Sequence, residues 1–92
     1  MKAPIEKGNV VISKKGRDKG RWFVVLYSLD ADFVMLADGD TRKLDHMKKK
    51  KRLHLSSTPH FFPELVALYE QGRLKDSDLR KALAPLREQP QV

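Results

Sequence analysis

Five cationic side chains cluster around two glycines in residues 13–23, which read SKKGRDKGRWF. They are Lys14, Lys15, Arg17, Lys19 and Arg21. Lysine and arginine on a turn can neutralise phosphates and release condensed counterions, and arginine can also form paired hydrogen bonds with phosphate oxygens. Gly20 lies where the chain must reverse, and a glycine there permits a positive φ and a close approach of another backbone. This pattern favours binding of a polyanion over the alternative, a solvated charged turn.

A second basic run, MKKKKR, spans residues 47–52 and follows Arg42 and Lys43. Its cations are Lys48, Lys49, Lys50, Lys51 and Arg52. Consecutive like charges repel one another, so we expect this run to be a mobile loop until an anion binds. It could extend the first basic patch or form a second one. A solvated lysine run and a short nuclear-localisation signal are the alternatives.

The net charge of +7 is unevenly distributed along the 92 residues. Residues 1–55 contain 14 basic and 7 acidic side chains, whereas residues 56–92 contain 5 of each. The positive charge therefore belongs to the first part of the chain. Such concentration favours a polyanionic partner over a general role in solubility.

Several other kinds of site are excluded by residue type or spacing. The chain has no cysteine, so it has neither disulfides nor thiolate metal ligands. His46, His54 and His60 are too scattered to predict a metal site. The glycines of GRDKGR are four residues apart and no Lys-Ser or Lys-Thr follows, unlike a P-loop. No nucleophile is spaced from a base in a recognised way, so we expect a non-enzyme without metal or cofactor.

The first part of the chain reads as short strands separated by turns. We expect strands at Asn9–Lys14, Arg21–Leu29, Phe33–Ala37, Thr41–Asp45 and Arg52–Leu55. The Asp38-Gly39 pair predicts a tight two-residue hairpin, in which both central residues need positive φ. Five short strands in about 50 residues predict a small, strongly bent barrel.

The strand at Arg21–Leu29 is apolar on both faces. Alternation places Trp22, Val24 and Leu26 on one face and Phe23, Val25 and Tyr27 on the other. Both faces must then be covered, one by the barrel interior and one by a lid from the second half of the chain. We expect Phe23, Tyr27 and Phe33 to be core residues. Trp22 is open to two interpretations, a core side chain or a platform for stacking a base.

The second half changes to helical spacing. SSTP at residues 56–59 should break the strand pattern, and apolar residues then recur at helical spacing from Phe61 to Tyr69. Pro63 fits the first helical turn, and Gly72 is placed as a stop.

A second helix is expected over residues 77–84. Asp76 or Asp78 should serve its N-terminus, and Pro85 should end it. The two helices could form a DNA-binding helix-turn-helix, but the zero net charge of residues 56–92 favours a helical pair packed on the strands.

Three segments together resemble a known family. GNVVISKKGRDKGRWFVV, VMLADG and TRKLDHMKKKKRLHL, within residues 8–55, resemble the KOW domains of eukaryotic and archaeal large-subunit ribosomal proteins. They are similar also to short bacterial KOW domain-containing RNA-binding proteins, whose C-terminal helix resembles KDSDLRKAL. The resemblance implies an SH3-like five-stranded barrel in residues 1–55, with residues 56–92 as a helical appendage packed on it.

The resemblance also implies a function and a set of contacts. It implies a non-catalytic, ribosome-associated protein that binds ribosomal RNA of the large subunit. By position it makes Lys14, Lys15, Arg17, Lys19 and Arg21 phosphate contacts, with Gly20 as the conformational requirement. The alternative is a protein-interaction adaptor in transcription or translation complexes, with a protein partner at the C-terminal helices.

The expected location and state follow from what the chain lacks. No apolar run reaches the roughly 18 to 20 residues of a membrane span, and MKAPIEKGNVV has no continuous apolar core of a signal peptide. We therefore expect a cytoplasmic protein that makes no membrane contact and is monomeric when free.

Overall fold

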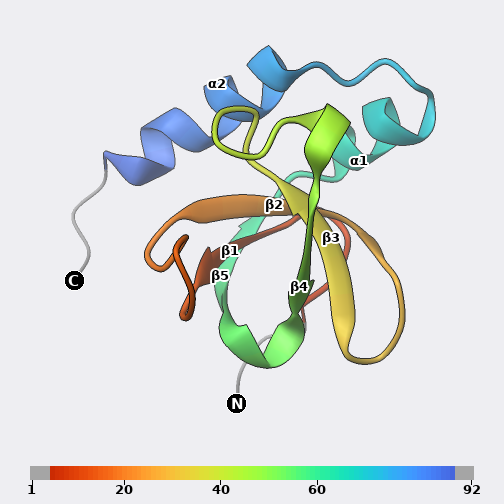
Figure 1. Ribbon diagram of the computed structural model, residues 1–92. Helices are drawn as coiled ribbons and strands as arrows, with labels where there is room; N and C mark the ends of the chain where they lie inside the picture. Colours follow the sequence, from red (N-terminus) through yellow and green to blue (C-terminus); the bar gives the residue numbers. More distant parts are fainter. Residues whose placement is uncertain (1–4, 89–92) are drawn as a thin grey trace.

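A five-stranded antiparallel sheet and two C-terminal helices form the protein in a computed structural model, which describes residues 5–88 (Figure 1). The strands are β1 (Asn9–Ser13), β2 (Trp22–Ser28), β3 (Phe33–Ala37), β4 (Lys48–Lys51) and β5 (Leu55–Phe61). The helices are α1 (Pro63–Glu70) and α2 (Asp76–Arg87), and two short 3-10 helices are η1 (Leu44–His46) and η2 (Arg52–His54).

The strand order is β4-β3-β2-β1-β5. Strands β1 to β4 pair with their neighbours in sequence, and β5 returns to pair with β1. In the β1–β2 hairpin, Val10 lies opposite Val24 and Ile12 opposite Trp22. This register places residues 14–21 as a loop at one end of the sheet.

Two apolar clusters lie on opposite faces of β2. One contains Val11, Phe23, Val25, Val34, Leu36 and Leu55. The other joins sheet residues Val10, Val24 and Leu26 to the helix residues Leu65, Leu79, Leu83 and Leu86. The prediction that β2 is covered on both faces, with the helices as a lid, is confirmed (Figure 1).

Tyr27 and Phe33 differ from the expected core positions. The β2–β3 register shifts between Val25 and Tyr27, and this irregularity turns Tyr27 to the helix-covered face. Its ring stacks on Tyr69 at a centroid distance of 5.9 Å. Phe33 belongs to neither cluster and is only half-buried, so its assignment to the core is wrong, whereas Phe23 is fully buried as expected.

The strand predictions hold for β1, β2 and β3 and fail in the later part of the sheet. Thr41–Asp45 is not a strand, and the fourth strand is the lysine run Lys48–Lys51. Arg52–Leu55 is mostly the η2 turn, and the fifth strand begins at Leu55 and continues to Phe61. The expected break at residues 56–59 is therefore wrong, because Pro59 is tolerated in a strand at the end of the strand order.

Asp38 and Gly39 do not form a two-residue hairpin. Only Gly39 has a positive φ, at 76°, and the loop closes instead through Asp38 N–H and Gly39 N–H donating to the Arg42 carbonyl. The fully buried Asp38 carboxylate accepts hydrogen bonds from the Asp40 and Arg42 N–H groups and from the Thr41 hydroxyl. These bonds fix the position of Arg42.

Helix α1 begins with Pro63 in its first turn as predicted, and α2 is longer than predicted. Asp78 accepts the Lys75 N–H at 3.0 Å and so caps α2, whereas Asp76 accepts the Leu44 N–H at 2.8 Å. Pro85 does not end α2, which continues to Arg87, because burial of Leu86 against the sheet favours the longer helix. Within residues 5–88, no helix is long and apolar enough to cross a membrane.

Candidate nucleic-acid interface

The β1–β2 loop is closed by backbone hydrogen bonds at its base and within its turn. Gly20 N–H donates to the Ser13 carbonyl at 2.8 Å, and Ser13 N–H donates to the Arg21 carbonyl at 3.0 Å. Gly20 has a φ of 87°, which confirms the conformational prediction. The close approach of another backbone is not found, because a Cβ on Gly20 would have no neighbour within 4 Å.

Asp18, the one acidic residue of the loop, anchors it to the sheet. Its Oδ1 accepts hydrogen bonds from the Ser13 hydroxyl at 2.7 Å and from Lys50 Nζ at 2.9 Å. Lys50 Nζ also donates to the Lys15 carbonyl at 2.7 Å, and Lys48 Nζ lies 3.6 Å from Asp18 Oδ2. The Asp18 carboxylate and two lysines of β4 therefore hold the loop against the sheet.

The electrostatics of this anchor keep Asp18 ionised. Burial raises the pKa of Asp18, but hydrogen bonds from Lys50 and Ser13 and the charges of Lys50 and Lys48 together bring it below its usual value. Lys50 itself is buried, with 7% of its surface exposed. Its ammonium therefore binds Asp18 and the Lys15 carbonyl inside the protein. The sequence predicts instead that Lys50 contacts phosphate.

The lysines of β4 divide between two faces because side chains alternate along a strand. Lys48 and Lys50 turn toward Asp18 in the loop. Lys49 and Lys51 lie over the Phe33 ring, at 4.6 and 6.0 Å from its centroid. The lysine run is thus an ordered strand paired with β3, and the prediction of a mobile loop is wrong.

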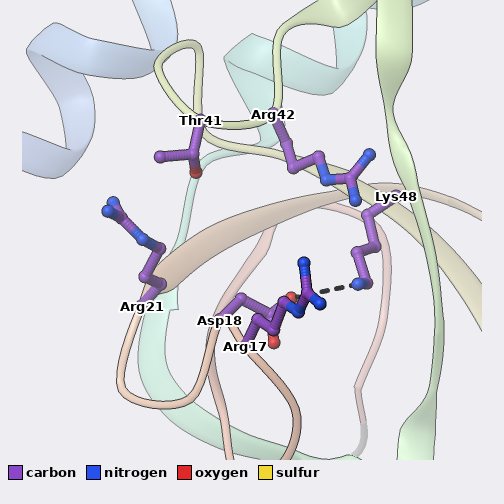
Figure 2. Close-up of a pocket in the computed structure, with 6 residues that line it drawn as sticks. All are labelled: Arg17, Asp18, Arg21, Thr41, Arg42 and Lys48. Carbon is purple, nitrogen blue, oxygen red and sulfur yellow. Dashed lines mark ion pairs between the residues drawn. The ribbon is translucent and has the colours of Figure 1, made fainter.

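A hollow of about 260 Å³ lies beside the anchored loop (Figure 2). It is lined by Arg17, Asp18, Arg21, Thr41, Arg42 and Lys48. Figure 2 shows the charged ends of Arg17, Arg42 and Lys48 turned toward one another, with Arg21 at the far side of the loop. Within residues 5–88, the guanidinium groups of Arg17, Arg21 and Arg42 have no hydrogen bond or ion pair to another residue. The hollow therefore presents unpaired cations beside one neutralised carboxylate.

The remaining expected cations lie around this hollow or away from it. Lys14, Lys15, Lys19 and Lys43 are exposed near the loop and the η1 turn. Arg52 lies elsewhere, because its guanidinium donates to the Ile5 carbonyl and the Ser28 hydroxyl. The structure thus brings two loop cations, Arg17 and Arg21, together with Arg42 and Lys48 around the hollow. Lys49, Lys51 and Arg52 do not line it.

His54 lies close to lysines of the loop and of β4, and their charges affect its pKa. Desolvation lowers its pKa, and the charges of Lys15, Lys50, Lys51 and Lys14 lower it further. The backbone of His54 also joins the loop, since its carbonyl accepts the Lys14 N–H at 2.8 Å. The pKa of this imidazole therefore depends on the positive charge of these lysines.

A second hollow, of about 280 Å³, shares Arg21 with the first. Gly20, Arg21, Trp22 and Arg87 line it. Trp22 is half-buried and packs against the helix-covered cluster, as expected of a core side chain. It also lines this hollow, as expected of a platform for stacking a base. Arg87 lies 3.6 Å from the buried Asp38 carboxylate, which orients it.

Sequence reasoning missed three residues of this interface: Asp18, Thr41 and Arg87. A signal for Asp18 was present, because it is a single acid among five cations in a loop. Nothing in the local pattern predicts Arg87, because its position depends on how the last turn of α2 packs beside β2.

No protein-family model matches the chain, and no curated protein matches it. Within residues 5–88, no three histidine or acidic side chains are grouped so that they could hold a metal ion.

Proposed function

We propose that this chain is a non-catalytic RNA-binding protein that docks on structured RNA through the β1–β2 loop and the adjoining cations of the sheet. The anchored loop is the observation that carries the proposal. Asp18 holds the loop to β4, while Arg17, Arg21 and Arg42 present unpaired guanidinium groups around one hollow. Because the loop backbone that carries Arg17 and Arg21 is already anchored, it needs little further ordering when these cations meet phosphates, which favours binding.

We assign the sheet to a small SH3-like barrel of the KOW type. The short antiparallel strands and the basic, glycine-containing β1–β2 loop support this assignment. The resemblance of residues 8–55 to ribosomal KOW domains makes ribosomal RNA of the large subunit the class to test first. Contacts of this kind position a protein on RNA through its backbone without reading sequence.

The packing of the helices favours RNA binding over the adaptor function. The buried side chains Leu65, Leu79 and Leu83 cover the sheet. These apolar positions are therefore unavailable to a protein partner at the same face. The exposed cations of the loop have no comparable use within the described fold.

The decisive experiment measures RNA affinity as a function of salt. Five cations of the interface, Lys15, Arg17, Lys19, Arg21 and Arg42, have no partner side chain among residues 5–88. If each neutralises one phosphate of a helical stem, the slope of log K against log salt should be about −4 to −5, from about 0.9 per phosphate. A slope near zero would contradict the phosphate mechanism.

The ribosomal assignment needs a second measurement. Lysate is fractionated on sucrose gradients at low and high salt, with a nuclease-treated sample as the control. We expect the protein to migrate with the large subunit at low salt and to leave it at high salt or after nuclease. Migration with a complex that resists nuclease would instead support the adaptor function.

A further inference from the structure

The two hollows beside the β1–β2 loop share one side chain. Arg21 lines both the hollow of about 280 Å³ with Trp22 and the hollow of about 260 Å³ with Arg17 and Arg42. A ligand that contacts Arg21 in both hollows would therefore lie against an aromatic side chain at one end and against three further cations, Arg17, Arg42 and Lys48, at the other. This order of surfaces matches a nucleotide, which joins an aromatic base to an anionic phosphate.

The hollow at Trp22 has the chemistry of a base platform. It has one half-buried indole and two exposed guanidinium groups, those of Arg21 and Arg87. Aromatic rings and arginine planes are the groups on which unpaired bases stack. Its volume of about 280 Å³ lies close to the lower end of small-ligand pockets, roughly 300 to 1,000 Å³, which suits a single ring system.

Arg87 is held in place for this role by a residue of the sheet. Its guanidinium lies 3.6 Å from the Asp38 carboxylate, and Asp38 is fully buried with three further hydrogen bonds from its own loop. Figure 1 shows the C-terminal end of α2 on the same side of the sheet as the β1–β2 loop. Helix α2 thus contributes one wall of the hollow, in addition to its cover of the sheet.

We propose that this surface selects an unpaired nucleotide, with the base against Trp22 between Arg21 and Arg87, and a neighbouring phosphate in the hollow of Arg17, Arg42 and Lys48. The inference rests on the proposed RNA-binding function and narrows it. Bases inside a helical stem are stacked on one another and cannot reach an indole, so the target is a loop, a bulge or a single-stranded segment beside a stem.

The test uses the single tryptophan of the chain as a reporter. The wild-type protein is titrated at low salt with a short uridine oligomer and with a base-free phosphodiester strand of the same length and charge. We expect the uridine oligomer to quench Trp22 emission and to bind about tenfold or more tightly than the base-free strand, from the stacking of one base. Equal affinity and unchanged emission would overturn the inference and leave phosphate binding intact.

A matched pair of variants locates the effect. Arg87→Gln should reduce the preference for the uridine oligomer, whereas Lys81→Gln, on the same helix and outside both hollows, should leave it unchanged. Equal reduction by both variants would overturn the assignment of the base to this hollow. Failure of both strands to bind the wild-type protein would contradict the RNA-binding function itself.

Discussion

Lys50 and Asp18 form the ion pair that joins the basic loop to the sheet, with Lys50 Nζ 2.9 Å from Asp18 Oδ1 and side chains only 8% and 12% exposed. The pair connects strand β4 to the β1–β2 loop, and the Ser13 hydroxyl completes it. Its consequence is that one lysine of the run gives up contact with solvent so that cations of the loop keep a fixed arrangement.

Replacement of Lys50 by methionine tests this structural role. Lys50→Met leaves Asp18 with Lys48 as its remaining cation. We therefore expect the free energy of unfolding, measured in urea, to fall by about 2 kcal/mol. This loss is smaller than the roughly 3 to 5 kcal/mol for breaking a fully buried pair, because Lys48 remains. Lys51→Met makes the same change at an exposed position of the same strand, and it should alter stability by less than about 0.5 kcal/mol. Equal effects of the two substitutions would contradict the anchor.

The anchor also predicts how stability depends on pH. The folded-state pKa of Asp18 is lower than the ordinary carboxyl value of 3.8, so its contribution is present above that value and is lost as the pH falls through the folded-state pKa. Asp18→Asn should therefore destabilise the protein at neutral pH, and its difference from wild type should shrink below about pH 4. Urea unfolding of both proteins across this range measures the effect. A difference that stays constant with pH would mean that ionisation of Asp18 does not stabilise the fold.

The part of this arrangement that follows from sequence is local. The strands β1, β2 and β3, the positive φ of Gly20 and the lid over β2 are set by alternation, glycine and apolar spacing, which are properties of short segments. Repulsion between consecutive charges predicts a mobile loop for the lysine run. In the fold, pairing with β3, the Asp18 carboxylate and the Phe33 ring offset that repulsion, and these partners are distant in sequence.

The interface shows the same division. The cations of the loop were recognisable from residue type and spacing. The sequence does not predict which lysines of the run face the loop. Side-chain alternation along β4 turns Lys48 toward the loop and Lys49 toward Phe33, and the sequence predicts no strand for this run. Arg87 enters through helix packing, which local patterns do not encode.

The unpaired arginines should matter for RNA and not for folding. We expect the double variant Arg17→Ala with Arg42→Ala to weaken RNA binding by about tenfold for each arginine. A tenfold change in affinity corresponds to a free energy near the lower end of that found for hydrogen bonds to charged groups. The slope of log K against log salt should become less steep by about 1 for each arginine, and the melting temperature should stay nearly unchanged.

A control with the same loss of charge separates position from net charge. Arg73→Ala with Lys81→Ala removes two exposed cations from the helical part of the chain, outside the hollow. Filter binding or fluorescence anisotropy with one RNA stem-loop compares the two double variants. If both lose the same affinity, binding depends on net charge alone and the loop is not a defined interface.

His54 should report RNA binding through its own titration. In the free protein, desolvation and then the charges of Lys15, Lys50, Lys51 and Lys14 lower its pKa. Bound phosphates would neutralise part of that charge, so the pKa of His54 should rise on binding. By linkage, RNA affinity should increase as the pH falls through the His54 pKa of the complex, and it should level off below the lower His54 pKa of the free protein, because the complex favours the protonated imidazole. The ring-proton NMR signal of His54, followed against pH with and without RNA, measures the shift, and His54→Gln should remove its contribution to the pH dependence of affinity. An identical titration of His54 in the free and RNA-saturated protein would place the RNA away from the basic loop.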